Sequence, residues 1–143
     1  MTIALDGFDV KLLAALQNNA ALTNAELGDV IGLSASQVSR RRQKLEEAGI
    51  IRRYRAALDP EALGLMVTAY VGVTLGAHSR ENARKFRNMV TAMPEVQEAH
   101  TLTGDVDYML KIVVPDLKAL SHIINDELLP QEAVHHVRSS IAM

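Results

Sequence analysis

Apolar residues recur every three or four positions in the first third of the chain, which is the spacing of amphipathic helices. This pattern predicts a helix over residues 6–19, begun by Asp6 as its N-cap. A second helix is predicted to begin at Thr23, which forms a capping-box pattern with Glu26. Two helices and a third that follows them need a shared core, for which we expect Leu12, Leu16, Leu27, Ile31, Leu33, Val38 and Leu45.

Residues 33–50 predict a third helix whose exposed surface differs from the first two. Ser34 is an N-cap with Gln37 three residues later, and Gly49 stands where a left-handed residue would end the helix. Between the apolar positions lie side chains that bond phosphates and base edges: Ser36, Gln37, Ser39, Arg40, Arg41, Gln43 and Lys44. This surface indicates a DNA-recognition helix, and an ordinary solvated helix with a run of charges is the alternative.

A short turn, residues 32–34, joins the second and third helices, and this arrangement is typical of a helix-turn-helix. After Gly49, residues 50–58 read as an extended segment that carries Arg52, Arg53 and Arg55. The segment is either a wing that brings these arginines to the phosphates or a plain linker strand, and the two readings are compatible.

The second half of the chain alternates between strand and helix patterns. Asp59-Pro60 marks a turn, so we expect one domain over residues 1–58 and another over residues 59–143. Strands are predicted at 65–75, 96–102, 106–114 and 133–142, and helices at 79–93 and 117–129. The order β-α-β-β-α-β predicts a ferredoxin-like sheet with both helices on one face, in an α+β protein.

The face of that sheet away from the helices would need a partner, which favours a dimer. The residues that we expect on it are Val71, Val73, Ile112 and Val114.

Composition excludes several classes of protein. The absence of cysteine among the 143 residues excludes disulfides and cysteine-ligated zinc and suits a reducing cytoplasm. No apolar run approaches the roughly 20 residues that span a bilayer, and the first residues lack the pattern of a signal peptide. We therefore expect a cytoplasmic protein that does not enter the membrane.

The charge is distributed unevenly along the chain. The net charge is −2, yet residues 40–55 hold seven bases and two acids. The local field, rather than the net charge, attracts a polyanion. Aromatic residues make up only 3% of the chain, which argues against stacking on single-stranded bases. Double-stranded DNA is the expected partner.

The order of several short motifs resembles the Lrp/AsnC family of bacterial and archaeal transcription regulators over essentially the whole chain. The most specific motif is Thr103-Gly104-Asp105-Val106-Asp107-Tyr108. The others are Leu5 to Leu13, Asn24 to Leu27, Ile31 to Ser34, Leu45 to Ile51, Tyr54 to Pro60, and Pro94-Glu95-Val96. Each is weak alone, and their order and spacing together are strong.

The resemblance implies a sequence-specific DNA-binding transcription regulator. Its fold would be a winged helix-turn-helix joined to a ferredoxin-like domain that binds an effector and drives assembly into homodimers, tetramers or octamers. The residues expected to contact bases and phosphates are Ser34, Ser36, Gln37, Ser39, Arg40 and Arg41, and those expected on the backbone are Lys44, Arg52, Arg53 and Arg55.

The family's effectors are usually amino acids, bound between the αβ domains near the Gly-Asp turn. The expected effector residues are His100, Thr101, Thr103, Gly104, Asp105, Asp107 and Tyr108. Asp105 and Asp107 would hold an ammonium, whereas hydroxyls and the backbone at Gly104 would hold a carboxylate. A plain turn with solvated charges is the alternative that the residues alone favour.

Two positions depart from the family pattern. Arg42 stands where an apolar residue is usual, and we expect its stem to lie on the core and its head to turn toward a phosphate. The loop from Pro130 to Val134 is about two residues longer than usual.

Two other functions compete with DNA regulation. Some proteins that resemble this fold decarboxylate tetrapyrroles, but an enzyme has no need to keep a base-reading helix, so we expect no catalysis and no cofactor. A metabolite-binding module that no longer touches DNA is the third possibility. The five histidines lack metal-ligand spacing, so no metal is expected; they are His78, His100, His122, His135 and His136.

Overall fold

A computed structural model of the chain describes residues 4–76 and 79–143. The chain divides into two compact units, Met1–Ala57 and Leu58–Met143.

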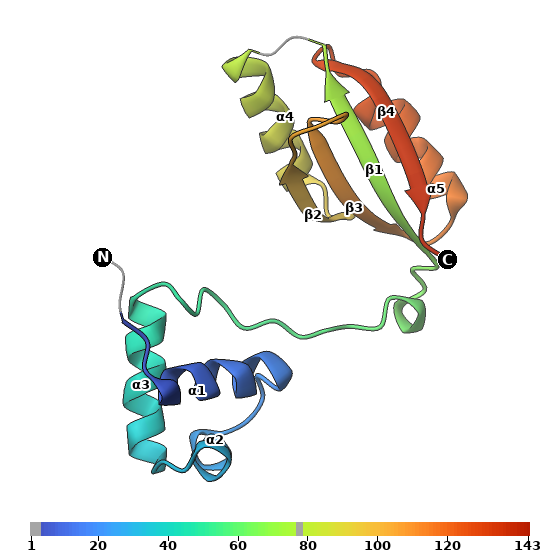
Figure 1. The fold of residues 1–143 in the computed structure, drawn as a ribbon. Coiled ribbons are helices and arrows are strands. Elements are labelled where there is room, and N and C mark those ends of the chain that lie inside the picture. Colours follow the sequence, from blue (N-terminus) through green and yellow to red (C-terminus); the bar gives the residue numbers. More distant parts are fainter. Residues whose placement is uncertain (1–3, 77–78) are drawn as a thin grey trace. The chain divides into compact units, whose positions relative to one another are not determined.

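The first unit consists of three helices, α1 (Gly7–Asn18), α2 (Asn24–Ile31) and α3 (Ala35–Glu47) (Figure 1). Each begins with a reciprocal capping box, in which the side chain of the N-cap residue and that of the third helical residue satisfy each other's backbone N–H. The pairs are Asp6 with Asp9, Thr23 with Glu26, and Ser34 with Gln37. The three predicted helices are therefore confirmed.

The α3 helix ends in a Schellman motif, with Gly49 in the left-handed region at φ 70°. The Gly49 N–H donates to the Glu46 carbonyl at 2.9 Å, and the Ile50 N–H donates to the Leu45 carbonyl at 3.0 Å. The following residues, 52–58, run as an irregular segment that forms neither helix nor strand. The helix-turn-helix is confirmed, whereas the expected wing is present only as a linker without strand pairing.

The core of the first unit lies where the three helices meet. Its buried residues are Leu12, Leu16, Leu27, Ile31, Val38 and Leu45, with Leu33 packed beside them, as predicted. Gly28 permits the tight approach of α2 to the turn, because a Cβ at this position would lie 2.3 Å from the Leu33 carbonyl oxygen. The same contact includes a hydrogen bond from the Leu33 N–H to the Gly28 carbonyl at 3.0 Å.

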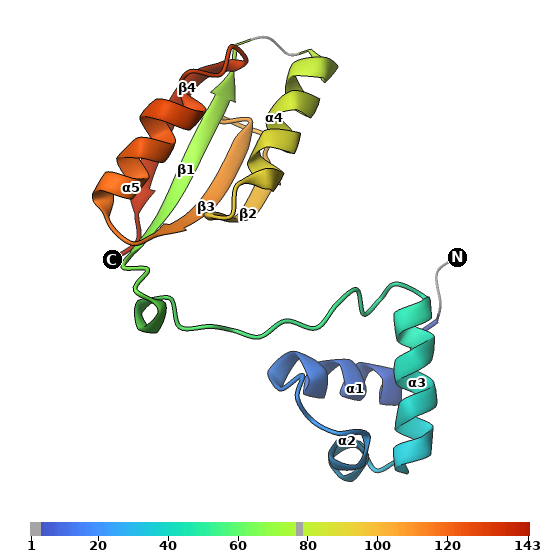
Figure 2. The same cartoon turned by 180° about the vertical axis from the view of Figure 1, so that it is seen from behind.

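The second unit is an antiparallel sheet with the strand order β2-β3-β1-β4. Its elements are β1 (Val67–Leu75), α4 (Arg80–Ala92), β2 (Val96–Thr101), β3 (Tyr108–Val114), α5 (Leu117–His122) and β4 (Val134–Ile141), after a short η1 turn at Glu61–Leu63. Figure 2 shows α4 and α5 together in front of the sheet, so both helices cover the same face. The ferredoxin-like fold and the α+β class are confirmed.

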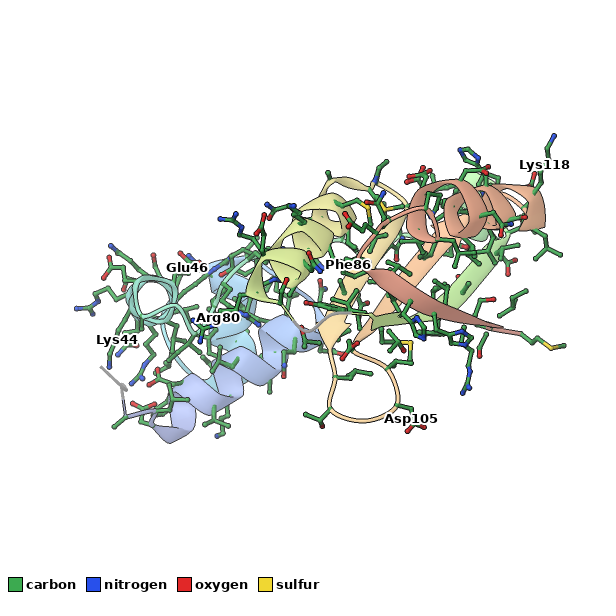
Figure 3. The ribbon with its side chains drawn as sticks, turned by 90° about the horizontal axis from the view of Figure 1, so that it is seen from above. Lys44, Glu46, Arg80, Phe86, Asp105 and Lys118 are labelled. Atoms are coloured by element: carbon green, nitrogen blue, oxygen red, sulfur yellow. The ribbon has the colours of Figure 1, made fainter. Side chains whose placement is uncertain are left out.

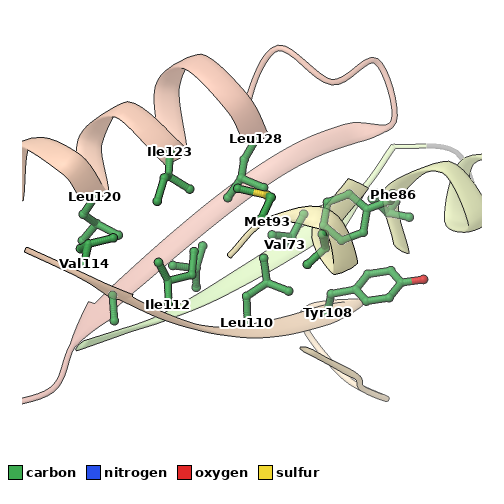
Figure 4. Packing of buried hydrophobic residues seen from close by; sticks show 14 residues of the cluster. Val73, Phe86, Met93, Tyr108, Leu110, Ile112, Val114, Leu120, Ile123 and Leu128 are labelled. Atoms are coloured by element: carbon green, nitrogen blue, oxygen red, sulfur yellow. The ribbon is translucent and has the colours of Figure 1, made fainter. Parts of the chain in front are cut away.

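The buried face of the sheet corrects one expectation. Val71, Val73, Ile112 and Val114 are fully buried beneath the helices, against residues such as Leu120 (Figure 4). They therefore cannot face a partner across the open side of the sheet. Because side chains alternate along a strand, the open face takes the intervening positions instead. These are more mixed in character: Thr68, Tyr70, Gly72 and Thr74 on β1, and Met109, Lys111 and Val113 on β3.

The last predicted helix is also interrupted. After α5 the chain continues as a π-helical segment, η2 (Ile123–Leu128), in which the Leu129 N–H reaches the Ile124 carbonyl at 2.9 Å. The wider turn allows both Ile123 and Leu128, five residues apart, to face the sheet. The following loop closes with a hydrogen bond from the Val134 N–H to the Gln131 carbonyl at 2.8 Å.

Candidate functional site

The α3 helix presents a polar surface opposite its two buried residues, Val38 and Leu45. Ser36, Arg40 and Gln43 recur at helical spacing, so they share one exposed stripe. Gln37 and Lys44 form a neighbouring exposed stripe, and Ser39 is exposed as well. None of the described residues forms an ion pair with Arg40 or Lys44, so both cations are available to an anionic partner.

Ser34 and Gln37 are used partly by the protein itself. The Gln37 Oε1 accepts hydrogen bonds from the Ser34 N–H and from the Ser34 hydroxyl, each at 3.0 Å. The cap therefore fixes the Gln37 side chain and leaves its amide NH₂ as the group that can reach a base acceptor. Ser34 acts mainly as the cap, so its contribution to a DNA contact is through the orientation of the first turn of α3.

Arg41 binds carboxylates within the first unit. Its Nη1 lies 2.7 Å from Asp6 Oδ2 and 2.7 Å from Asp9 Oδ1, and the Asp9 side chain is only 2% exposed. The Asp9 N–H and the Arg41 guanidinium together lower the pKa of the Asp6 carboxyl. Arg41 thus ties the middle of α3 to the start of α1, which favours a positioning role over a base contact.

The Arg42 guanidinium also binds other groups of the protein and does not extend into solvent, where it could meet a phosphate. Its Nε donates to the Tyr54 hydroxyl at 2.7 Å, and its Nη1 donates to Asn24 Oδ1 at 3.3 Å. The guanidinium carbon also lies 4.6 Å from the centre of the Tyr54 ring. The head of Arg42 is therefore engaged, contrary to the expectation that it turns toward a phosphate.

The linker arginines Arg52, Arg53 and Arg55 are all exposed. They line a groove of about 860 Å³ between the linker and the end of α1, which contributes Leu13 and Gln17. The first unit therefore carries these three linker cations in addition to the cations of α3.

In the second unit, the turn between β2 and β3 is built around the Asp107 carboxylate. Its Oδ2 accepts from the Leu75 N–H at 2.7 Å, and the Asp107 N–H donates to the Val73 carbonyl at 3.0 Å. Gly104 has a φ of 138°, a conformation that L side chains rarely adopt. The turn therefore has a specific geometry and is more than a string of solvated charges.

A cavity of about 220 Å³ lies beside this turn. It gathers three of the predicted effector residues, Thr101, Asp107 and Tyr108, and the other lining residues are Leu75, Ser79, Arg80 and Ala83. The cavity therefore combines a carboxylate, a guanidinium, the hydroxyl-bearing residues Ser79, Thr101 and Tyr108, and an apolar wall. This set of groups can hold the two charges and the side chain of a zwitterion.

The remaining predicted effector residues lie elsewhere. Thr103, Gly104 and Asp105 are exposed in the turn, and Asp105 stands at its tip, pointing away from the sheet (Figure 3). His100 pairs with Met109 across the strands, whereas Thr101 pairs with Tyr108, so His100 projects from the opposite face to the cavity. There the imidazole lies 3.3 Å from Glu98, and His100, followed by Lys111, lowers the pKa of that carboxyl.

Sequence reasoning missed Ser79 and Arg80 because it kept the site within residues 100–108. In a β-α-β-β order, the start of the first helix lies beside the start of the third strand. This topological rule was the signal that would have added the N-terminus of α4. Phe86, nearly two turns further along α4, packs on the Tyr108 ring with centroids 4.9 Å apart and supports that wall of the cavity.

The part of the chain that the structure describes contains no group of three His, Asp or Glu side chains placed to hold a metal ion. His78, one of the five histidines, lies outside the described residues. Within the same residues, no helix has both the length and the apolar character needed to cross a membrane.

Comparison with known families matches both units. The AsnC-type helix-turn-helix domain matches residues 5–46, and the Lrp/AsnC ligand binding domain matches residues 68–143.

Individual relatives match along nearly the whole chain. The chain is 40% identical over 143 residues to transcriptional regulator AzlB of Bacillus subtilis, covering 100% of this chain and 91% of that protein. It is 37% identical to a leucine-responsive regulatory protein of Rhizobium meliloti, covering 99% and 90%. Among solved structures, a transcriptional regulator from Neisseria meningitidis in complex with L-Met matches with a TM-score of 0.93 and 38% identity, over 98% of this chain and 90% of that one.

Proposed function

The chain belongs to the Lrp/AsnC family of transcription regulators, and we propose that its α3 helix reads the major groove of DNA under the control of an amino-acid effector. The observation that carries this proposal is the exposed polar surface of α3, which is held by a capped start and by two buried residues, Val38 and Leu45. A recognition helix needs both features, because its side chains specify bases only when the helix itself is fixed.

The DNA contacts divide by chemistry. Ser36, Gln37, Ser39 and Arg40 face outward on α3, and hydroxyl, amide and guanidinium groups can bond base edges. Lys44 and the linker residues Arg52, Arg53 and Arg55 supply the charge for phosphates. We assign Arg41 to positioning α3, since its guanidinium is bound to Asp6 and Asp9.

We propose that the effector is an amino acid bound in the cavity beside the Asp107 turn. The Arg80 guanidinium would hold its carboxylate, and the Asp107 carboxylate would hold its ammonium, since Asp107 keeps an oxygen beyond the one bonded to Leu75. The apolar wall at Leu75 and Ala83 favours an aliphatic or thioether side chain. The related Neisseria meningitidis regulator in complex with L-Met supports this class of ligand.

The proposed assembly is a cytoplasmic homodimer that associates further into tetramers or octamers. Its support is the open face of the sheet, where Tyr70 is 45% exposed although it lies in the middle of a central strand. We propose no catalytic role, because the family is one of transcription regulators and the α3 surface is that of a DNA reader.

The test of DNA binding is a mobility-shift titration on the gene's own upstream region at several salt concentrations. We expect binding that weakens steeply with salt and that exceeds binding to unrelated DNA. Binding that ignores salt, or that treats all DNA alike, would contradict the proposal.

The test of the effector is a thermal-shift screen of L-amino acids, with L-Met as the first probe. A ligand that binds only the folded protein raises its melting temperature. The exposed Arg80 permits a clean variant, so we expect Arg80→Ala to melt like the wild type and to lose the shift. A shift that persists in Arg80→Ala would rule out this cavity.

A further inference from the structure

Tyr54 attaches the start of the linker to the recognition helix. Its hydroxyl donates to Glu46 Oε1 at 2.6 Å and accepts from Arg42 Nε at 2.7 Å. Burial, with the Glu46 carboxylate beside it, raises the pKa of the Tyr54 hydroxyl above its ordinary value. The Arg42 guanidinium also stacks over the face of the Tyr54 ring.

Arg42 extends the same network to the preceding helix. Its Nη1 donates to the side chain of Asn24, the first residue of α2, and its Nε lies 3.4 Å from Glu46 Oε1. One guanidinium therefore connects the start of α2, the second half of α3 and the linker. We call Arg42, Tyr54, Glu46 and Asn24 the linker clamp.

The linker clamp changes where the linker begins. The α3 helix ends at Glu47, and the last backbone hydrogen bond to it after the Schellman motif runs from the Ile51 N–H to the Leu45 carbonyl at 3.1 Å. Without further contacts the chain would be free from there on. Because Tyr54 is bound to α3, residues 51–54 stay with the helix, and the segment that lacks hydrogen bonds to the helices of the first unit starts at Arg55.

When the free part of the linker starts after Tyr54 and in a fixed direction, fewer separations are possible between the two α3 helices of a dimer. Dimeric helix-turn-helix proteins bind half-sites separated by about one helical turn of DNA, or by multiples of it, so their linkers control which separations are possible. A shorter free segment also samples fewer separations than a longer one.

We propose that the linker clamp determines the half-site spacing of this regulator by fixing the direction in which the linker leaves α3. The inference rests on the proposed function, because it requires two copies that bind paired half-sites. Arg42 and Tyr54 are then positioning residues and make no DNA contact themselves. This role also gives Arg42 a reason to occupy a position where the family resemblance leads us to expect an apolar residue.

The experiment is a selection of binding sites from a random DNA pool with the full-length chain, followed by sequencing. We expect the wild type to enrich one spacing between two half-sites. Tyr54→Phe keeps the ring under Arg42 and removes both hydroxyl bonds, whereas Arg42→Met keeps an apolar stem and removes all of its hydrogen bonds. Both variants should enrich the same half-site sequence at several spacings, with a several-fold rise in the share of sites outside the wild-type spacing.

Arg52→Ala is the matched control, because it removes a linker cation outside the clamp. It should lower affinity and keep the single spacing. Folding is followed by thermal melting, and Tyr54→Phe decides the outcome if Arg42→Met does not fold. A single unchanged spacing in a folded Tyr54→Phe variant would overturn the inference while leaving the proposed function intact. Failure of the wild type to enrich any paired half-sites would instead overturn the proposed function and the inference with it.

Discussion

Gly28 offers a sharp test of how the helix-turn-helix positions α3. In Gly28→Ala the new Cβ would lie 2.3 Å from the Leu33 carbonyl oxygen, against at least 3.4 Å for an ordinary contact, so the α2–α3 turn must open by about 1 Å. The atom in the way belongs to the backbone, and no side-chain rotation can relieve it. We therefore expect the turn itself to move, together with the first residues of α3.

The cost can be estimated from two opposing effects. Overpacking costs roughly 1–3 kcal/mol, and the upper end applies here because the clashing atom is a backbone oxygen, whereas replacing a helical glycine with alanine returns about 1 kcal/mol. A net loss of about 2 kcal/mol is large for the first unit, since a domain of its size has roughly 3–8 kcal/mol of stability. The melting temperature of that unit should fall by roughly 8–16 °C.

Gly7→Ala is the matched control, because nothing lies within 4 Å of a Cβ built at Gly7. It should stabilise the unit by about 0.4–1 kcal/mol through the unfolded chain. Calorimetry of the full chain measures both changes, and hydrogen exchange locates the loss of Gly28→Ala in the amides of α2 and α3. DNA affinity should fall roughly tenfold if one base contact is lost. A Gly28→Ala variant as stable as the wild type would refute the tight approach of α2 to the turn.

Three further outcomes follow from the side-chain contacts. Arg41→Ala should lower the melting temperature because it leaves the buried Asp9 without its cation. Arg40→Ala should melt like the wild type and relax the DNA sequence preference. Equal melting temperatures of the two variants would contradict these roles. The capping carboxyls of Asp6 and Glu26 have lowered pKa values in the folded state, so the unfolded chain binds more protons than the folded chain. Denaturation experiments should therefore show the free energy of unfolding falling as the pH drops below about 4.5, the ordinary pKa of Glu. A rise in the free energy of unfolding over that range would contradict the role of the caps. Asp107→Ala should lower the free energy of unfolding, measured by chemical denaturation, by about 1–2 kcal/mol because the Leu75 N–H loses its acceptor. Asp107→Asn should keep that hydrogen bond and lose only amino-acid binding. Full amino-acid binding by Asp107→Asn would exclude Asp107 as the ammonium partner.

Local signals in the sequence were sufficient for the helices of the first unit. A cap such as Ser34 and an apolar repeat such as Val38 with Leu45 act within one or two turns, so a reader of the sequence has all the information that the backbone uses. The same holds for the order of strands and helices in the second unit.

Contacts between distant residues were harder to predict. The alternation along a strand separates two sets of residues without saying which set faces the helices. The pattern alone therefore does not place Val71 and Ile112 on the buried face, where they lie. The proposed effector cavity was hard to predict for the same reason, because Arg80 and Asp107 come to line one cavity only through the packing of α4 on the sheet. The π-helical turn depends on the packing of Leu128 and has no local pattern.

The run Arg40-Arg41-Arg42 shows why a count of charges overstates what reaches DNA. Residues 40–55 contain seven bases, but Arg41 binds two carboxylates and Arg42 binds Glu46, which leaves five cations per chain without an ion pair in the described structure: Arg40, Lys44, Arg52, Arg53 and Arg55.

The salt dependence of binding to non-specific DNA can distinguish five contacts from seven. Each phosphate contact contributes about −0.9 to the slope of log K against log salt, so five contacts per chain set a limit of about −4.5, and seven would give about −6.3. Removing a free cation in Arg53→Ala should make the slope per chain less steep by about 0.9. Arg42→Ala should leave the slope unchanged, because its guanidinium already has protein partners. An equal change in both variants would mean that the linker clamp opens on DNA and releases Arg42 to the phosphates.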